Sequence, residues 1–278
     1  MKITPLSIPC LAFALCWASP SIAGNPWADH VVQYEPGTGI GKDWVTGNYI
    51  DNPLTALGEP TRYTGDAATF GGPTSPFNAP YRDHEVVTLG AGGTLTLRFD
   101  EPVINHPLNP FGIDLLIFGN AFYTLVGDYG PNGVASSAFP DEGGKIEVSA
   151  NGVHFVTVSG SADRAFPTVG YLDVVDPSTS AAGTVLSDFT KPVDPSFNPT
   201  GLNTAQIIAG YNGSGGGFGI DLTSVGLSSI THIRFSNPAG SLTTPEIDAV
   251  ADVAAVPEPA TLGMLAIAAA GMLIRQRR

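Results

Sequence analysis

The sequence predicts an all-β fold: a single β-sandwich, jelly-roll-like, with long loops. Three observations predict it: short runs in which apolar and polar residues alternate, turn residues between these runs, and almost no helical periodicity. Glycine occurs 34 times and proline 24 times in the 278 residues, which is typical of a chain with many turns. The sandwich is expected over residues 24–255, a length that one β domain can have.

The clearest strand is expected over residues 93–99. Leu95, Leu97 and Phe99 recur with a period of two, so they share one face of a half-buried strand. A short helix is expected over 203–209, with Asn203 as its N-cap. Further strands are expected over 113–118, 145–150, 153–158, 230–235 and 245–253.

Asn151 and Gly152 separate two of these runs. Asn-Gly between β-prone segments favours a two-residue type I′ turn, because that turn requires positive φ at both central positions. The sequence therefore predicts a tight hairpin at this point.

The first 23 residues have the pattern of a secretory signal peptide. Lys2 precedes a short apolar run, and small residues precede the expected cleavage between Ala23 and Gly24. A lipoprotein signal at Cys16 is disfavoured because bulky Leu15 precedes it. Both cysteines of the chain, Cys10 and Cys16, lie in this segment, so no disulfide is expected in the body.

The body is strongly acidic. Residues 24–255 contain eight Lys and Arg residues against 24 Asp and Glu residues, a net charge of −16. Such a charge repels nucleic acid and anionic lipid, and it attracts cations. We therefore expect no nucleic-acid partner.

Sequence motifs of hydrolytic enzymes are incomplete. His84-Glu85 opens a zinc-protease motif, but Thr88 stands where the second histidine is required. There is no Gly-x-Ser-x-Gly motif and no cysteine in the body. Because 24 acidic residues offer many carboxylate pairs, a glycoside hydrolase remains the alternative to a non-catalytic protein.

Three aspartates are candidate calcium ligands. Asp114 and Asp248 stand in otherwise apolar runs, and Asp221 follows a glycine-rich loop. A buried carboxylate needs a partner, which could be an arginine, backbone N–H groups or a metal ion. Structural calcium at these residues is the cofactor that the sequence suggests, and strand ends or turn caps are the alternative.

Aromatic residues in or near loops are candidate contacts for sugar rings. More often such residues close the edges of a β core. The candidates are Tyr34, Trp44, Tyr49, Tyr63, Tyr81, Tyr123 and Tyr129.

The C-terminal end has three parts. Pro257 and Pro259 flank Glu258 after Val256, in a segment that proline keeps extended. Residues 262–274 are mostly apolar but shorter than the ~20 residues of a stable membrane span. A basic cluster of Arg275, Arg277 and Arg278 follows, which the positive-inside rule places in the cytoplasm.

This order of proline-flanked glutamate, short apolar helix and arginine cluster resembles the PEP-CTERM sorting signal of Gram-negative bacteria. The resemblance implies export through the secretory translocon, a transient inner-membrane anchor, and removal of residues 256–278 by an exosortase, a membrane transpeptidase-like enzyme. It also implies a cell-surface or extracellular destination, because proteins with this signal often accompany exopolysaccharide production.

The body also resembles uncharacterised PEP-CTERM cell-surface proteins. The group resembles carbohydrate-binding jelly rolls in its strand pattern, and no activity follows from that likeness. We expect a non-catalytic module that contacts polysaccharide or is purely structural, with a secreted carbohydrate-active hydrolase as the alternative. The matching stretches are residues 87–93, 95–100, 112–122, 146–149, 218–222 and 246–250.

Overall fold

The computed structural model describes residues 25–66, 69, 71–138, 140–162 and 166–253. The signal peptide expected over 1–23, its cleavage site and the tail expected over 256–278 lie outside these residues. Within the described ranges, no helix has both the length and the apolar character needed to cross a membrane.

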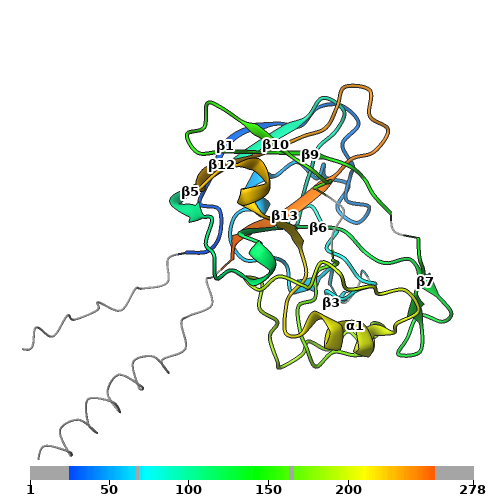
Figure 1. The fold of residues 1–278 in the computed structure, drawn as a ribbon. Coiled ribbons are helices and arrows are strands. Elements are labelled where there is room, and N and C mark those ends of the chain that lie inside the picture. The colour runs from blue at the N-terminus through cyan, green and yellow to red at the C-terminus, as the bar shows by residue number, and fades with distance from the viewer. Residues whose placement is uncertain (1–24, 67–68, 70, 139, 163–165, 254–278) are drawn as a thin grey trace, which may run out of the picture.

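The larger sheet has five strands in the order β1-β5-β12-β9-β10, and every neighbouring pair is antiparallel. Its strands form the upper layer in Figure 1. They are β1 (His30–Glu35), β5 (Thr94–Ile104), β9 (Lys145–Ser149), β10 (Val156–Val158) and β12 (Ser229–Ser236).

The second sheet has the order β11-β6-β13-β4 and is also antiparallel. Its strands are β4 (Val87–Thr88), β6 (Leu115–Gly119), β11 (Phe218–Ile220) and β13 (Glu246–Asp252). Side chains of both sheets form one apolar core, in which Leu97 of β5, Ile233 of β12 and Ile117 of β6 are fully buried. The all-β prediction is thus confirmed.

The predicted strands lie close to the observed ones. Leu95, Leu97 and Phe99 of β5 point into the core as their period of two predicts. β9 and β10 pair as predicted, but the predicted two-residue turn between them is wrong. Val156 pairs with Val148, so residues 150–155 form a longer connection in which Gly152 has positive φ and Asn151 does not.

Asn151 explains the longer connection. Its side-chain oxygen accepts hydrogen bonds from the backbone N–H groups of Val153 at 2.9 Å and His154 at 3.0 Å. This Asx-type turn competes with the type I′ turn, because the asparagine binds the backbone locally instead of adopting positive φ.

Loops and one helix form a third layer on the outer face of the four-stranded sheet (Figure 1). Phe189 of this layer packs edge-on against Phe118 of β6, with ring centroids 5.3 Å apart. The helix α1 (Thr204–Tyr211) begins as predicted after Asn203, whose side chain accepts from the N–H of Gln206.

Short elements complete the fold. Two-stranded ribbons pair β2 with β3 and β7 with β8, and the described connections contain three 3₁₀ helices. Their bounds are β2 (Tyr63–Thr64), β3 (Gly72–Pro73), β7 (Leu125–Val126), β8 (Val134–Ala135), η1 (Pro53–Ala56), η2 (Pro110–Gly112) and η3 (Leu222–Val225).

Candidate functional site

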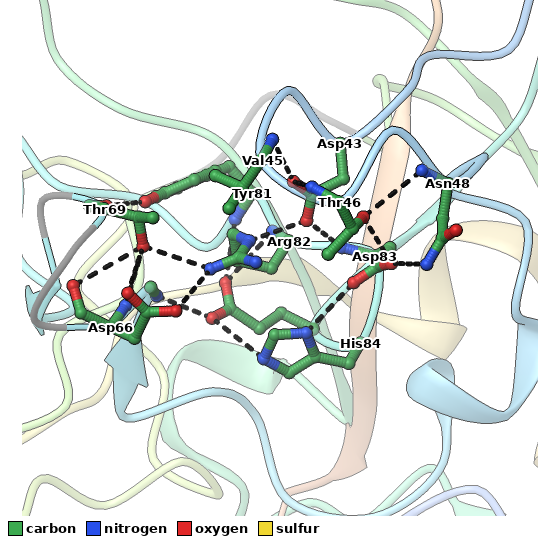
Figure 2. Close-up of polar contacts among 12 residues, drawn as sticks. Asp43, Val45, Thr46, Asn48, Asp66, Thr69, Tyr81, Arg82, Asp83 and His84 are labelled. Atoms are coloured by element: carbon green, nitrogen blue, oxygen red, sulfur yellow. Dashed lines mark hydrogen bonds and ion pairs between the residues drawn. The ribbon is translucent and has the colours of Figure 1, made fainter.

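A buried ion pair lies under the loop that follows β1. The Arg82 Nε atom is 2.6 Å from Asp43 Oδ2, and both side chains are almost fully buried. The same guanidinium donates to Thr69 Oγ1 at 3.1 Å and to Asp66 Oδ2 at 3.3 Å (Figure 2). The hydrogen bond that Arg82 donates to Asp43, together with the bond to Asp66, raises the pKa of the guanidinium, although burial acts in the opposite direction.

Asp43 shapes residues 42–52, which we call the 42–52 loop. Its Oδ1 atom accepts from the N–H of Val45 at 2.7 Å and of Thr46 at 3.2 Å, while its other oxygen faces Arg82. Burial alone would raise the pKa of Asp43. The hydrogen bond from Arg82 and those from backbone N–H groups outweigh burial and hold this pKa well below its ordinary value. The loop is therefore built around a permanent charge.

Asp83 attaches the other side of the loop. Its Oδ2 atom accepts from Thr46 Oγ1 and Asn48 Nδ2, each at 2.9 Å, and its Oδ1 atom lies 3.1 Å from His84 Nδ1 (Figure 2). Burial opposes ionisation of Asp83, but the bonds from Asn48, His84 and Thr46 lower its pKa overall. Adjacent residues of one segment, Arg82 and Asp83, thus hold the loop at two points.

Aromatic rings stand on this loop. Trp44 is 62% exposed and stacks on Tyr81, with ring centroids 6.2 Å apart and an angle of 16° between the rings. Tyr49 is 51% exposed, and the Lys42 ammonium lies 4.4 Å from the centre of its ring. The rings are therefore held by stacking and cation–π contacts while part of their surface faces solvent.

An open hollow of about 600 Å³ adjoins Tyr49. Its wall combines an aromatic ring with amides, carboxylates and an imidazole, which are the groups that bind hydroxyl-rich ligands. We call Trp44, Tyr49 and this hollow the loop face. The hollow is lined by Gly47, Asn48, Tyr49, Asp51, Asn52, Asp83 and His84.

The seven predicted aromatic candidates divide into two groups. Trp44 and Tyr49 belong to the 42–52 loop, and Tyr81 stacks on Trp44 while Tyr49 lines the hollow. The remaining four lie elsewhere: Tyr34 donates to the Thr88 carbonyl, Tyr63 donates to the Ser180 carbonyl, Tyr123 contacts Tyr211 in the interior, and Tyr129 is exposed between β7 and β8.

Asp114 and Asp221, two of the predicted calcium ligands, lie near each other. Fully buried Asp114 accepts hydrogen bonds from the N–H groups of His106 and Leu222, both at 3.0 Å, and from Asn109 Nδ2 at 2.9 Å. Asp221, directly before Leu222, caps η3. Protein donors therefore satisfy the Asp114 carboxylate without a cation.

Asp248, the third predicted ligand, lies within β13. It accepts from the N–H and the hydroxyl of Thr61, both at 2.9 Å. Among the described residues, no three His, Cys, Asp or Glu side chains are grouped so that they could hold a metal ion. The three predicted aspartates therefore do not form one such group.

A second hollow lies on the outer side of the four-stranded sheet. It has a volume of about 480 Å³ and runs along the edge strand β11, where Phe218 and Phe166 are half-buried. We call it the Phe218 cleft. None of the described residues that line it is charged. They are Ile113, Leu116, Tyr123, Ser136, Ser137, Phe166, Pro192, Val193, Pro195, Asn198, Pro199, Thr200, Gly217, Phe218 and Gly219.

The model of the PEP-CTERM protein-sorting motif matches residues 255–278. The chain carries a PEP-CTERM sorting motif. The predicted resemblance of the tail is thereby confirmed, and the motif implies export, processing by an exosortase and sorting to the cell surface. The comparison with curated proteins gives no match.

The PEP-CTERM motif starts directly after the sandwich. Val253, the last described residue, is 3% exposed and donates its N–H to the Asp114 carbonyl at 3.0 Å. The N–H of Asp252 donates to the carbonyl of Pro26, so both ends of the described body lie on one side of the molecule (Figure 1).

The sequence prediction missed Asp43, Arg82 and Glu85. Glu85 is buried and accepts from Thr64 Oγ1 at 2.6 Å and from the N–H of Tyr81 at 3.0 Å. One signal was available: residues 82–85 are all charged or histidine and immediately precede the buried residues 86–89. Such a run beside a core segment indicates paired charges, because unpaired charges are rarely buried.

Proposed function

We propose that the mature protein is a non-catalytic cell-surface or matrix module that contacts polysaccharide through the loop face. The main support for this proposal is that Trp44 and Tyr49 are exposed on a loop that the Asp43–Arg82 ion pair holds in place. A ring held in place loses little conformational entropy when a sugar stacks on it. The sorting motif supports this proposal, because it directs the protein to the cell surface.

The charges of the loop face favour a neutral polysaccharide. Asp51 and Asp83 line the hollow, and their carboxylates accept hydrogen bonds from sugar hydroxyl groups. A polymer rich in uronate groups would meet these carboxylates and the net charge of −16 on the body. Binding of a neutral glycan is therefore expected to be stronger than binding of a polyanionic one.

Truncation of the exposed rings tests the proposal. Trp44→Ala and Tyr49→Ala should each weaken binding of a neutral polysaccharide by about tenfold or more, since buried aromatic contacts contribute above 1 kcal/mol at binding hot spots. Tyr129→Ala is the matched control, because Tyr129 is 52% exposed and lies between β7 and β8. Affinity is measured on a glycan array and by calorimetry.

The outcomes separate the proposals. If no neutral or acidic glycan binds, or if Tyr129→Ala weakens binding as much as Tyr49→Ala, the loop face is not the contact. The same titration in a chelator tests the calcium hypothesis, since a calcium-supported face would lose affinity when the metal is removed.

Asp51 and Asp83 also favour a second candidate function, a secreted carbohydrate-active hydrolase. Glycosidases use two carboxyl groups that flank the scissile bond, and these two acids line one hollow. The test is whether the wild-type protein releases reducing sugar ends from a polysaccharide. If it does, and if Asp51→Asn and Asp83→Asn each abolish this activity, the protein is a hydrolase and not a non-catalytic binding module.

A further inference from the structure

The Phe218 cleft is a hollow in the surface of an acidic protein, and every described residue of its lining is uncharged. Its lining includes Phe166 and Phe218, which are both half-buried, together with Leu116, Pro192 and Pro195. Phe218 also packs against the core between the two sheets. Exposed apolar surface that is concave and without charge favours an apolar occupant, because a charged or strongly hydrated group would lose water without gaining a partner.

The chain leaves the sandwich beside this cleft. The Val253 side chain packs in the same buried cluster as Ile113 and Leu116, and both of these residues line the cleft. The Val253 N–H also bonds to the carbonyl of Asp114, which follows Ile113. Val253, where the described chain ends, therefore belongs to the same cluster as two residues of the cleft lining.

That segment has the length and chemistry to enter the cleft. Residues 254–261 separate Val253 from the apolar run 262–274, and an extended chain covers up to ~3.3–3.6 Å per residue. The run itself contains no charged residue and includes Leu262, Met264, Leu265 and Ile267. A hollow of about 480 Å³ has room for a few aliphatic side chains, though not for a whole helix.

We propose that the apolar run 262–274 docks some of its side chains into the Phe218 cleft before the tail is removed. The sandwich then covers part of its own sorting tail while the precursor is in water. Transfer of these apolar side chains from water to the cleft supplies the driving force. Insertion into the membrane competes with this docking, and removal of the tail leaves the cleft open.

Disulfide trapping tests the docking. In the full chain with Cys10→Ser and Cys16→Ser, Ser137→Cys is combined with Leu265→Cys; Ser137 lines the cleft and is exposed. An intramolecular disulfide is expected to form at least about tenfold faster than in the control, since docking raises the effective concentration of the two thiols. The control pair is Val153→Cys with Leu265→Cys, because Val153 is 73% exposed on the β9–β10 connection.

A second pair of substitutions keeps the sandwich unchanged. Ile267→Asp with Leu273→Asp should slow disulfide formation at residue 137 to the control rate, because carboxylates do not enter an uncharged cleft. Equal rates for the two cysteine pairs would overturn the proposal. So would disulfides that form only between two molecules, which would show that a second copy occupies the cleft. Neither result bears on glycan binding at the loop face.

Discussion

Arg82→Met is expected to lower the free energy of unfolding by about 3–5 kcal/mol, because it leaves a buried carboxylate without its counter-charge. The Asp43 side chain is fully buried, and its Oδ2 atom keeps only the 3.2 Å hydrogen bond from the Asp83 N–H after the substitution. Methionine fills much of the arginine volume, so the loss reports the charge rather than a cavity. Urea denaturation measures it.

Arg98→Met is the matched control. Arg98 also pairs with an aspartate, at 2.7 Å from Asp100, but the two side chains are 40% and 57% exposed. An exposed pair contributes about 0–1 kcal/mol, so this variant should remain close to the wild type. Equal losses in the two variants would contradict the assignment of Arg82 as the charge that holds the loop.

A double substitution separates charge from packing. Arg82→Met combined with Asp43→Asn removes both charges, so it should destabilise the protein less than the sum of the two single changes. Hydrogen exchange gives a local measurement, because the Val45 and Thr46 amides bond to the Asp43 carboxylate. Faster exchange of these two amides in Arg82→Met would show that the ion pair keeps the 42–52 loop in its folded conformation.

The sandwich was predictable from local pattern. Leu95, Leu97 and Phe99 are spaced so that only a strand places them on one face, and the core lies on that face. Asn203 lies directly before the helix and caps it through its side chain. The strand and the helix cap depend on residues that are close together in the sequence, so the sequence alone was enough to predict them.

The polar contacts were harder to predict from the sequence, because they join segments that are far apart along the chain. The sequence showed that Asp114 needs a partner, but its donors come from residues 106, 109 and 222. Arg82 meets Asp43 across 39 positions, and no periodicity relates the two residues. Loop-to-loop hydrogen bonds are set by the whole fold, so the stacking of Trp44 on Tyr81 also required the structure.

The stability of the protein is expected to fall as pH rises from about 4 to about 8. Burial first, with the charge of Glu142 adding to it, raises the pKa of Glu246 to about 8. Burial likewise raises the pKa of Asp248 to about 7, against the hydrogen bonds from Thr61 and with a further increase from Glu85. Both pKa values lie above the ordinary values of 4.5 and 3.8.

The sign follows from proton counting. Between its ordinary pKa and its raised pKa, each carboxyl keeps its proton in the folded state and loses it in the unfolded state. The unfolded state is then favoured by up to about 1.4 kcal/mol per pH unit for each group. Below pH about 4 the opposite holds for Asp43, whose lowered pKa means that acid removes stability. Maximum stability is therefore expected near pH 4–5.

Asp248→Asn combined with Glu246→Gln should flatten this decline, because neither amide titrates. Two other acids keep part of the slope in this variant. Burial and the charges of Asp114 and Glu101 raise the pKa of Asp252 to about 7, and burial also raises the pKa of Glu142. Asp100→Asn is the control, since that side chain is 57% exposed. Urea denaturation at pH 4.5, 6 and 7.5 measures the slope, and an unchanged slope in the double variant would exclude Glu246 and Asp248 as its source.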